Sequence, residues 1–332
     1  MQYRKLGKYG TKVSAISVGG WLTFGMNVDD QTSLNSLEVA VEEGINFIDV
    51  ADVYNKGESE RVVGEFLKDR DRAEFVISSK VYGKMSENPN DRGLSQKHIR
   101  ESIEKSLHRL NTDYLDIYFC HRYDYSTPLE ETIRTMNNLI DEGLVNYWGT
   151  STWFAAEIER AVGIAKELGL RPPAVEQPRY NLLDRYIEKE LWYTIDGHGI
   201  GITVWSPLAQ GILTGKYLDG IPEDSRHARY NKLAEREMTE EVFAKLRKLR
   251  ELAKENDMTL TQLSLAWALS RPQISSLITG VSKPEQVREN AAAGEINLSR
   301  ELVEEIERIM DNEPEYHPSY RVNYRNYLKG LL

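Results

Sequence analysis

The amino-acid sequence predicts an α/β fold, a single (β/α)8 TIM barrel, and three observations support this prediction. Short unbroken apolar runs, typical of strands buried on both faces, alternate with longer segments that have one apolar face, typical of helices. One strand and one helix recur about every 30 residues, which favours a parallel sheet with right-handed crossovers. The apolar runs number eight, which is the strand count of this barrel.

The eight apolar runs are the candidate barrel strands. They lie at residues 13–18, 47–48, 75–77, 115–119, 144–147, 174–175, 200–204 and 277–278. Ahead of them, residues 1–12 are expected to form a β-hairpin that covers the bottom of the barrel. Between the seventh and eighth strands, residues 206–258 exceed what one connection needs, which predicts a long loop insertion containing a helix on Val242, Leu246 and Leu249.

The candidate helices have apolar residues three and four positions apart. These faces are Leu34-Leu37-Val41, Ile99-Ile103-Leu107-Leu110, Leu129-Ile133-Met136-Ile140 and Ile158-Val162-Ala165. A further helix is expected after Leu298. No linker or composition shift divides the chain, so residues 1–332 are interpreted as one domain with a C-terminal tail, residues 313–332. A doubly wound sheet is the rival fold, but its G-x-G-x-x-G pattern is absent after the first strand.

Composition and charge exclude several classes of protein. The chain has 42 Lys and Arg against 52 Asp and Glu, a formal net charge of −10, which argues against a general nucleic-acid surface. The single cysteine, Cys120, excludes a disulfide framework, and the histidines show no metal-ligand spacing. No apolar run approaches ~20 residues, and the N-terminus lacks the apolar core of a signal peptide. We therefore expect a cytoplasmic protein with no metal and no membrane insertion.

Polar or small residues stand at the C-terminal end of every candidate strand. In chain order they are Gly19-Gly20-Trp21, Asp49, Lys80, His121, Ser151, Gln177, Trp205-Ser206 and Thr279-Gly280. A TIM barrel brings these ends to one mouth, where its active site lies. Asp49, Lys80 and His121 end three successive strands, and Tyr54 follows in the loop after Asp49. Four titratable side chains of different types are therefore expected in one pocket.

The chemistry that suits this cluster is proton transfer. A free tyrosine has a pKa near ~10, and a neighbouring ammonium group lowers it, so Lys80 is expected to make Tyr54 a better acid–base. Asp49 would hold Lys80 in place and compensate its burial. His121 could donate a hydrogen bond to a substrate oxygen. Because the cluster contains neither a nucleophile nor a set of metal ligands, it implies an external reactant such as a hydride donor.

Seven segments carry a resemblance to a known family. They are IDVADVYNKGESE, VISSKVYG, YFCHRYD, YWGTSTW, EQPRYNLLDR, WSPLAQGILTGKY and ITGVSKPEQVREN. In order and spacing they resemble the signature blocks of the aldo-keto reductase superfamily. The chain is most similar to the branch that contains the β subunits of voltage-gated potassium channels. The resemblance implies a (β/α)8 barrel, bound NADPH and reduction of aldehydes or ketones to alcohols by an Asp-Tyr-Lys-His tetrad, here Asp49, Tyr54, Lys80 and His121.

The resemblance also implies which residues bind NADPH or NADP+ and the substrate. The cofactor positions are Gly20, Trp21, Asp49, Ser151, Gln177, Trp205, Ser206, Pro207, Leu208, Gly211, Lys216, Arg226, Gly280, Ser282, Gln286, Glu289 and Asn290. Gln177 matches the glutamine that binds the carboxamide, and Trp205 matches the ring that stacks on the nicotinamide. A helix starting near Pro284 would aim backbone N–H groups at an anion. The substrate pocket is expected to contain Trp21, Tyr54, His121 and Trp153.

Three positions depart from the family pattern. Many members place Lys and Arg near positions 280 and 286 to bind the 2′-phosphate, whereas this chain has Gly280 and Gln286. Lys216 and Arg226 are then the expected source of positive charge, which favours NADPH over NADH. Position 152 is Thr, where the similar branch often has Arg.

Two other functions remain open from the sequence. A regulator similar to the channel β subunits would bind NADP(H) tightly, sense redox state and turn over slowly, and the same resemblance implies a homotetramer. A barrel lyase or aldolase would use Lys80 as a Schiff-base nucleophile without nicotinamide.

Overall fold

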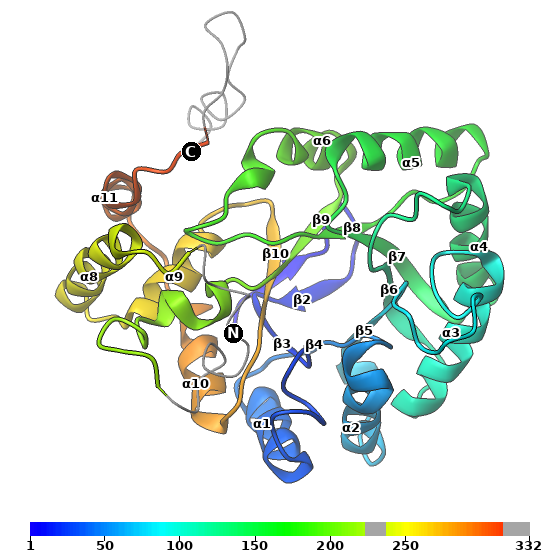
Figure 1. The fold of residues 1–332 in the computed structure, drawn as a ribbon, viewed down its shortest axis with the longest axis horizontal. Coiled ribbons are helices and arrows are strands. Elements are labelled where there is room, and N and C mark those ends of the chain that lie inside the picture. The colour runs from blue at the N-terminus through cyan, green and yellow to red at the C-terminus, as the bar shows by residue number, and fades with distance from the viewer. Residues whose placement is uncertain (223–236, 315–332) are drawn as a thin grey trace, which may run out of the picture.

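Eight parallel strands close into a barrel that the helices surround (Figure 1). The computed structural model describes residues 1–222 and 237–314. The barrel strands are β3 (Ile16–Gly19), β4 (Phe47–Asp49), β5 (Val76–Val81), β6 (Leu115–Cys120), β7 (Val145–Ser151), β8 (Val175–Gln177), β9 (Gly201–Trp205) and β10 (Ile274–Thr279). They follow one another around the barrel in chain order, and β10 pairs back onto β3. The fold predicted from the sequence is confirmed.

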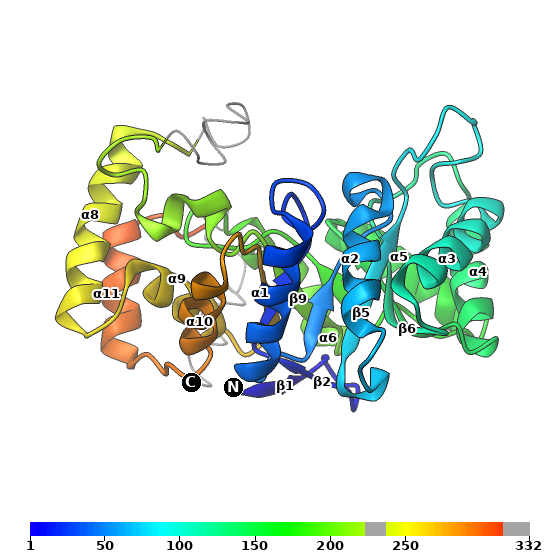
Figure 2. The same ribbon diagram turned by 90° about the horizontal axis from the view of Figure 1, so that it is seen from below.

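A two-stranded hairpin closes one end of the barrel (Figure 2). Its antiparallel strands are β1 (Tyr3–Lys5) and β2 (Lys12–Ser14). Leu6 and Val13 are fully buried and belong to the apolar cluster inside the barrel. The start predicted for the first barrel strand, residues 13–18, is wrong, because this strand begins at Ile16 and residues 13 and 14 belong to β2. Val13 instead belongs to the hairpin, where its side chain helps to fill the open barrel end.

The expected apolar faces all lie on helices of the outer layer. The helices are α1 (Asp30–Glu42), α2 (Glu58–Leu67), α3 (Gln96–Leu110), α4 (Leu129–Asp141), α5 (Ala155–Glu167), α6 (Leu191–His198), α8 (Glu240–Glu255), α9 (Leu260–Leu269), α10 (Pro284–Ala293) and α11 (Arg300–Met310). Within residues 1–222 and 237–314, every helix is too short or too polar to span a bilayer.

Helix α9 was not predicted, because its apolar residues are spread around all sides and show no helical period. The structure explains this pattern. All but one of its ten residues are buried, since α9 packs against β10, α10 and α8 together. Helices α8 and α11 lie beside it, outside the main ring of helices (Figure 1).

The predicted insertion, residues 206–258, begins with the 3₁₀ segment η4 (Ala209–Thr214) and contains α8, which carries the expected face of Val242, Leu246 and Leu249. Arg226 lies outside the described residues, as does most of the C-terminal tail. The prediction of one domain over residues 1–332 therefore includes two segments that the structure does not describe.

Helices α2 and α3 approach each other closely at Gly64. A Cβ atom at this position would lie 2.1 Å from the carbonyl oxygen of Arg109, far inside van der Waals contact. The close approach brings Glu60 of α2 against Arg109 of α3, whose Nε donates a 2.7 Å hydrogen bond to the Glu60 carboxylate. Gly163 of α5 offers a contrast, since no atom of the described residues that could clash lies within 4 Å of its Cβ position.

We expect Gly64→Ala to lower the free energy of unfolding by about 1–3 kcal/mol, because the methyl group forces α2 and α3 apart. The matched control, Gly163→Ala, should raise it by about 0.5–1 kcal/mol through helix propensity. Urea denaturation monitored by circular dichroism measures both. Equal changes in the free energy of unfolding for the two substitutions would contradict the close approach of α2 and α3.

Candidate functional site

The four side chains predicted to converge lie together at the C-terminal mouth of the barrel. Asp49 ends β4, Lys80 lies near the end of β5, His121 follows β6, and Tyr54 begins the 3₁₀ segment η1 (Tyr54–Gly57). The Lys80 ammonium nitrogen lies 2.5 Å from a carboxylate oxygen of Asp49 and 4.9 Å from the centroid of the Tyr54 ring. The Tyr54 and His121 rings meet edge to face, with their centroids 5.7 Å apart.

The Asp49–Lys80 ion pair is buried, and other polar groups complete its hydrogen bonding. Lys80 Nζ also donates to the Val50 carbonyl at 2.8 Å. The second oxygen of Asp49 accepts from the Ser78 hydroxyl at 2.6 Å and from the Gln177 side-chain amide at 3.0 Å. Ser78 was not predicted as a site residue, although its spacing of two from Lys80 puts both on one face of the strand. The pair is thus fixed by groups on β5, on β8 across the barrel and just after β4.

Burial and charge set the protonation of the other groups. Burial raises the pKa of Tyr54 and outweighs the lowering effect of Lys80, so the net direction is upward. The expected net lowering is therefore wrong, because the phenol lies in a desolvated site. Burial lowers the pKa of Lys80, but Asp49 and Tyr54 more than offset it, and the pKa is raised. Burial, with Lys80 and Arg122, holds the pKa of His121 well below its usual value.

These directions argue against the lyase or aldolase alternative. A Schiff-base lysine must be a neutral amine to attack a carbonyl carbon, and burial with a lowered pKa is the usual way to obtain one. The Lys80 pKa is raised instead, and its ammonium group is committed to Asp49 and Val50. The geometry favours a fixed positive charge at this position.

The rim beside the tetrad contains several residues with positive φ. Leu22, Thr152 and Ser206 each follow a barrel strand and have φ angles of 60°, 60° and 50°. Such strain at non-glycine residues persists where the surrounding structure fixes it, often at functional sites. Thr152 stands where Arg was noted as common in the similar branch. Here its hydroxyl accepts a 3.3 Å hydrogen bond from the indole N–H of Trp205.

Other expected nicotinamide-side residues lie on this rim. Ser151 and Gln177 are cross-strand partners at the ends of β7 and β8, and both are buried. Trp205 ends β9 half-buried, while Gly20 and Trp21 follow β3. Trp153, expected in the substrate pocket, is fully buried in the core with its ring edge-on to Tyr123 at 4.7 Å. A substrate contact of Trp153 stays a prediction that this burial does not favour.

The segment after β9 forms a compact turn. Pro207 is buried, Ser206 and Leu208 are half-buried, and Gln210 and Gly211 both have positive φ. A Cβ on Gly211 would lie 2.8 Å from Lys216 Nζ, so the missing side chain lets the ammonium group approach the turn. Lys216 itself is exposed.

The expected adenosine-end residues lie on and before α10. Gly280 and Ser282 are exposed, Gln286 and Glu289 are half-buried, and Asn290 is buried. The Gln286 side-chain oxygen accepts from the Ser282 backbone N–H at 2.8 Å, and a Glu289 oxygen accepts from the Thr259 hydroxyl at 2.8 Å. Helix α10 begins at Pro284, as expected, and the side chain of its N-cap residue, Lys283, makes no capping hydrogen bond.

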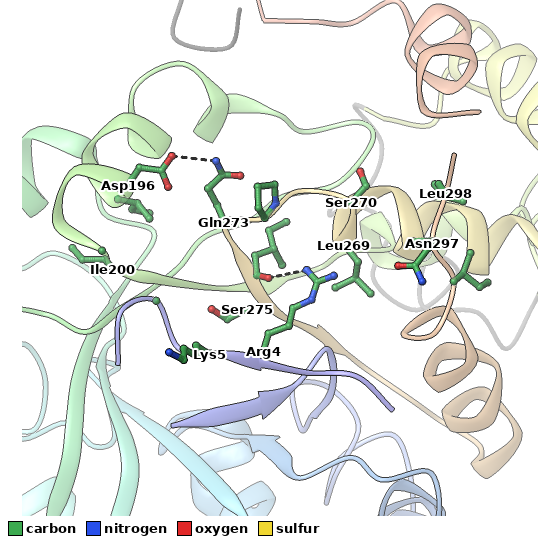
Figure 3. Close-up of a pocket in the computed structure, with 17 residues that line it drawn as sticks. Arg4, Lys5, Asp196, Ile200, Leu269, Ser270, Gln273, Ser275, Asn297 and Leu298 are labelled. Atoms are coloured by element: carbon green, nitrogen blue, oxygen red, sulfur yellow. Dashed lines mark hydrogen bonds between the residues drawn. The ribbon is translucent and has the colours of Figure 1, made fainter. Parts of the chain in front are cut away.

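A cavity of about 750 Å³ lies at the other end of the barrel, beside β1 and the start of β10 (Figure 3). Arg4 donates to the Ile274 carbonyl at 3.0 Å, and Gln273 donates to Asp196 at 3.1 Å. None of the tetrad lines this cavity. We place the chemistry at the mouth instead, because the perturbed acid–base groups converge there. In the described part of the chain, no three His, Cys, Asp or Glu are placed to hold a metal ion.

Comparison with known proteins identifies close relatives. A family model described as "Aldo/keto reductase family" matches residues 15–311. An Arabidopsis thaliana protein named "Probable voltage-gated potassium channel subunit beta" is 44% identical over 329 residues, covering 97% of this chain and 100% of the relative. A protein of the same name from Oryza sativa subsp. japonica is 43% identical over 329 residues, with the same two coverages.

We expect Asp49→Asn to lower the free energy of unfolding at pH 7 by about 3–5 kcal/mol, because it leaves the Lys80 ammonium group buried without a carboxylate. Asp113→Asn, at an exposed position, makes the same charge change and should stay within about 0.5 kcal/mol of wild type. Urea denaturation of the three proteins makes the comparison. A loss for Asp49→Asn no larger than for the control would show that the ion pair contributes little.

Proposed function

The chain belongs to the aldo/keto reductase family, and we propose that it is an NADPH-dependent oxidoreductase that reduces aldehydes or ketones to alcohols. The observation that carries this proposal is the buried Asp49–Lys80 pair next to Tyr54 and His121 at the barrel mouth. This cluster can donate a proton to a substrate oxygen and take one up again. It contains no side chain placed to attack the substrate as a nucleophile.

Tyr54 is the proposed proton donor. Its raised pKa keeps the phenol protonated at neutral pH, which a group that gives its proton to a carbonyl oxygen requires. As the proton leaves, the Lys80 ammonium group stabilises the phenolate that forms. Asp49 acts through Lys80, since it fixes the position of the ammonium group by a 2.5 Å contact.

His121 is proposed to orient the substrate carbonyl. Its pKa is held well below the usual value, so the ring is neutral and donates one hydrogen bond without competing as an acid. The edge-to-face contact with Tyr54 aims both side chains at the same region of the mouth. A carbonyl oxygen between them would receive two hydrogen bonds, which polarises the carbonyl.

The residues present fit a dinucleotide. The half-buried Trp205 ring and the Gln177 side chain suit a nicotinamide ring and its carboxamide. The turn at Gly211, with Lys216 close by, and the uncapped N-terminus of α10 suit phosphate groups. When bound, NADPH supplies the hydride that reduces the carbonyl carbon.

A second candidate function follows from the names of the relatives. Proteins 43–44% identical over nearly the whole chain are named channel β subunits. This supports an alternative in which the chain binds NADP(H) tightly, turns over slowly and acts as a regulatory subunit of an assembly, with a homotetramer as the proposed form. The tetrad is common to both candidates, so the rate of turnover separates them.

With NADPH and a simple aldehyde, we expect repeated turnover by the wild-type protein, followed as loss of cofactor absorbance at 340 nm. Tyr54→Phe should lower kcat by about 10²–10⁴-fold because it removes the proton donor, while the affinity for NADPH stays nearly unchanged. Tyr193→Phe, at an exposed position, is the matched control.

A single slow oxidation with retained cofactor would favour the regulatory candidate. Turnover of Tyr54→Phe at the wild-type rate would remove Tyr54 from the mechanism.

Lys216→Gln should weaken NADPH binding by about tenfold and leave NADH binding nearly unchanged, if the ammonium group contacts the 2′-phosphate. Fluorescence titration of the two cofactors against the same protein preparation measures this. Lys248→Gln on α8 is a control for net charge. Equal loss for both cofactors would assign Lys216 to the shared pyrophosphate, and no loss for either would remove it from the site.

A further inference from the structure

A buried carboxyl group lies beneath the loop that carries Tyr54, and the mechanism above does not use it. Asp52 is 1% exposed, and neither of its carboxyl oxygens has a well-formed hydrogen bond within the described residues. An ionised carboxylate in such a place has lost its water without gaining a partner, which is costly. The usual result is that the group keeps its proton.

Groups on three elements face Asp52. On α2, Glu60 is fully buried and accepts from Ser79 at 2.5 Å. On α3, Arg109 approaches the Glu60 carboxylate to 2.6 Å. On β6, the Tyr118 hydroxyl is buried and has no hydrogen-bond partner among the described residues, and the nearby Asp52 is one cause of its raised pKa. The remaining charge is Lys80, on the opposite face of β5.

Of these two buried carboxyl groups, Glu60 forms the ion pair with Arg109, and Asp52 forms none within the described residues. The Glu60 carboxylate accepts hydrogen bonds from Arg109 and from the Ser79 hydroxyl, so the negative charge resides on Glu60. A second negative charge on Asp52 would be repelled by it. Burial first and Glu60 second raise the pKa of Asp52 to about 8, against smaller opposing effects of the Val53 N–H, Arg109 and Lys80. At neutral pH Asp52 is mostly the uncharged acid.

The main chain of the same loop holds the catalytic groups. The Asp52 N–H donates to the Lys80 carbonyl at 3.3 Å, and the Val50 carbonyl accepts from Lys80 Nζ at 2.8 Å. The Tyr54 N–H donates to the Ala51 carbonyl at 3.1 Å. Residues 50–54 thus contact Lys80 through their main chain and end at Tyr54, and the Asp52 side chain is buried at the middle of this loop.

We propose that Asp52 is a positioning residue whose uncharged carboxyl group anchors the loop of residues 50–54, and that loss of its proton releases this loop and withdraws Tyr54 from the mouth. The proposal deepens the proposed function and rests on it for its effect on catalysis. Ionised Asp52 gains solvent only if the loop moves, because the folded position is buried and the favourable effects of the Val53 N–H, Arg109 and Lys80 are outweighed there. The protein would therefore lose activity at alkaline pH before Tyr54 itself ionises.

The effect on stability has a definite sign. An acid whose folded pKa lies near 8 and whose unfolded pKa lies near ~4 binds more protons in the folded state between these values. Its stabilising contribution is complete below about pH 4 and is lost as the pH rises to about 8. Asp52→Asn keeps the shape and cannot ionise, so it should not show this loss.

The first experiment is urea denaturation of wild type, Asp52→Asn and the exposed control Asp69→Asn from pH 4.5 to 9. As the pH rises to about 8, the urea midpoint of wild type should fall relative to that of Asp52→Asn. Above this pH the difference between the two midpoints should stay constant, and Asp69→Asn should follow wild type throughout. This readout needs no substrate and tests Asp52 independently of the proposed function. A constant difference between wild type and Asp52→Asn across this range would overturn the proposal.

The second experiment measures kcat/KM with NADPH and a simple aldehyde against pH. Wild type and Asp69→Asn should lose activity with a midpoint near pH 8, falling about tenfold per pH unit, while in Asp52→Asn the alkaline loss should move upward by at least one pH unit. An unchanged midpoint in Asp52→Asn would overturn the role of Asp52. Absence of any turnover in all three proteins would contradict the proposed function and leave the stability result to decide on Asp52.

Hydrogen exchange of the wild-type protein alone supplies a further measurement should Asp52→Asn fail to fold. After correction for the intrinsic effect of pH, protection of the peptide containing residues 50–54 should fall between pH 6.5 and 8.5, while that of β7 stays constant. Unchanged protection of residues 50–54 would show that the loop is not released, and the proposal would be wrong.

Discussion

The buried contact between the Lys80 ammonium group and the Asp49 carboxylate fixes the arrangement on which the rest of the site depends. Each charge would be strongly unfavourable in this place without the other. Ser78, Gln177 and the Val50 carbonyl take up the remaining hydrogen-bonding positions, so the pair has one satisfied geometry. That geometry holds a positive charge beside the Tyr54 ring without help from a substrate.

Strand β5 connects this interior pair to a second polar cluster outside the barrel, because neighbouring residues on a strand face opposite sides. Ser78 and Lys80 face Asp49 in the barrel mouth, whereas Ser79 faces Glu60 on α2. Strand β6 repeats this division, since Phe119 belongs to the inner apolar cluster and Tyr118 to the outer one.

The sequence predicts the barrel and the tetrad because both follow from local patterns. Strand ends can be located from apolar runs, and a parallel barrel brings those ends together whatever the intervening loops do. Helix α9 could not be found in this way, since a helix covered on all sides has no polar face. Asp52 and Glu60 are ordinary acids in the sequence. Their burial becomes visible only when the approach of α2 to α3 at Gly64 is known.

The raised pKa of Tyr54 shows that the protonation of this group cannot be predicted from the neighbouring charge of Lys80 alone. The Lys80 ammonium group was expected to decide the direction of this pKa. Burial, however, acts on every group of the mouth, and it raises the pKa of acids and lowers the pKa of bases. Lys80 stays charged because Asp49 offsets its burial, while His121 has no such partner and stays neutral. Tyr54 and Asp52 are both acids in desolvated positions, and both keep their protons at pH 7. Burial therefore keeps Tyr54, Asp52 and His121 uncharged, and Lys80 carries charge because its partners outweigh its burial.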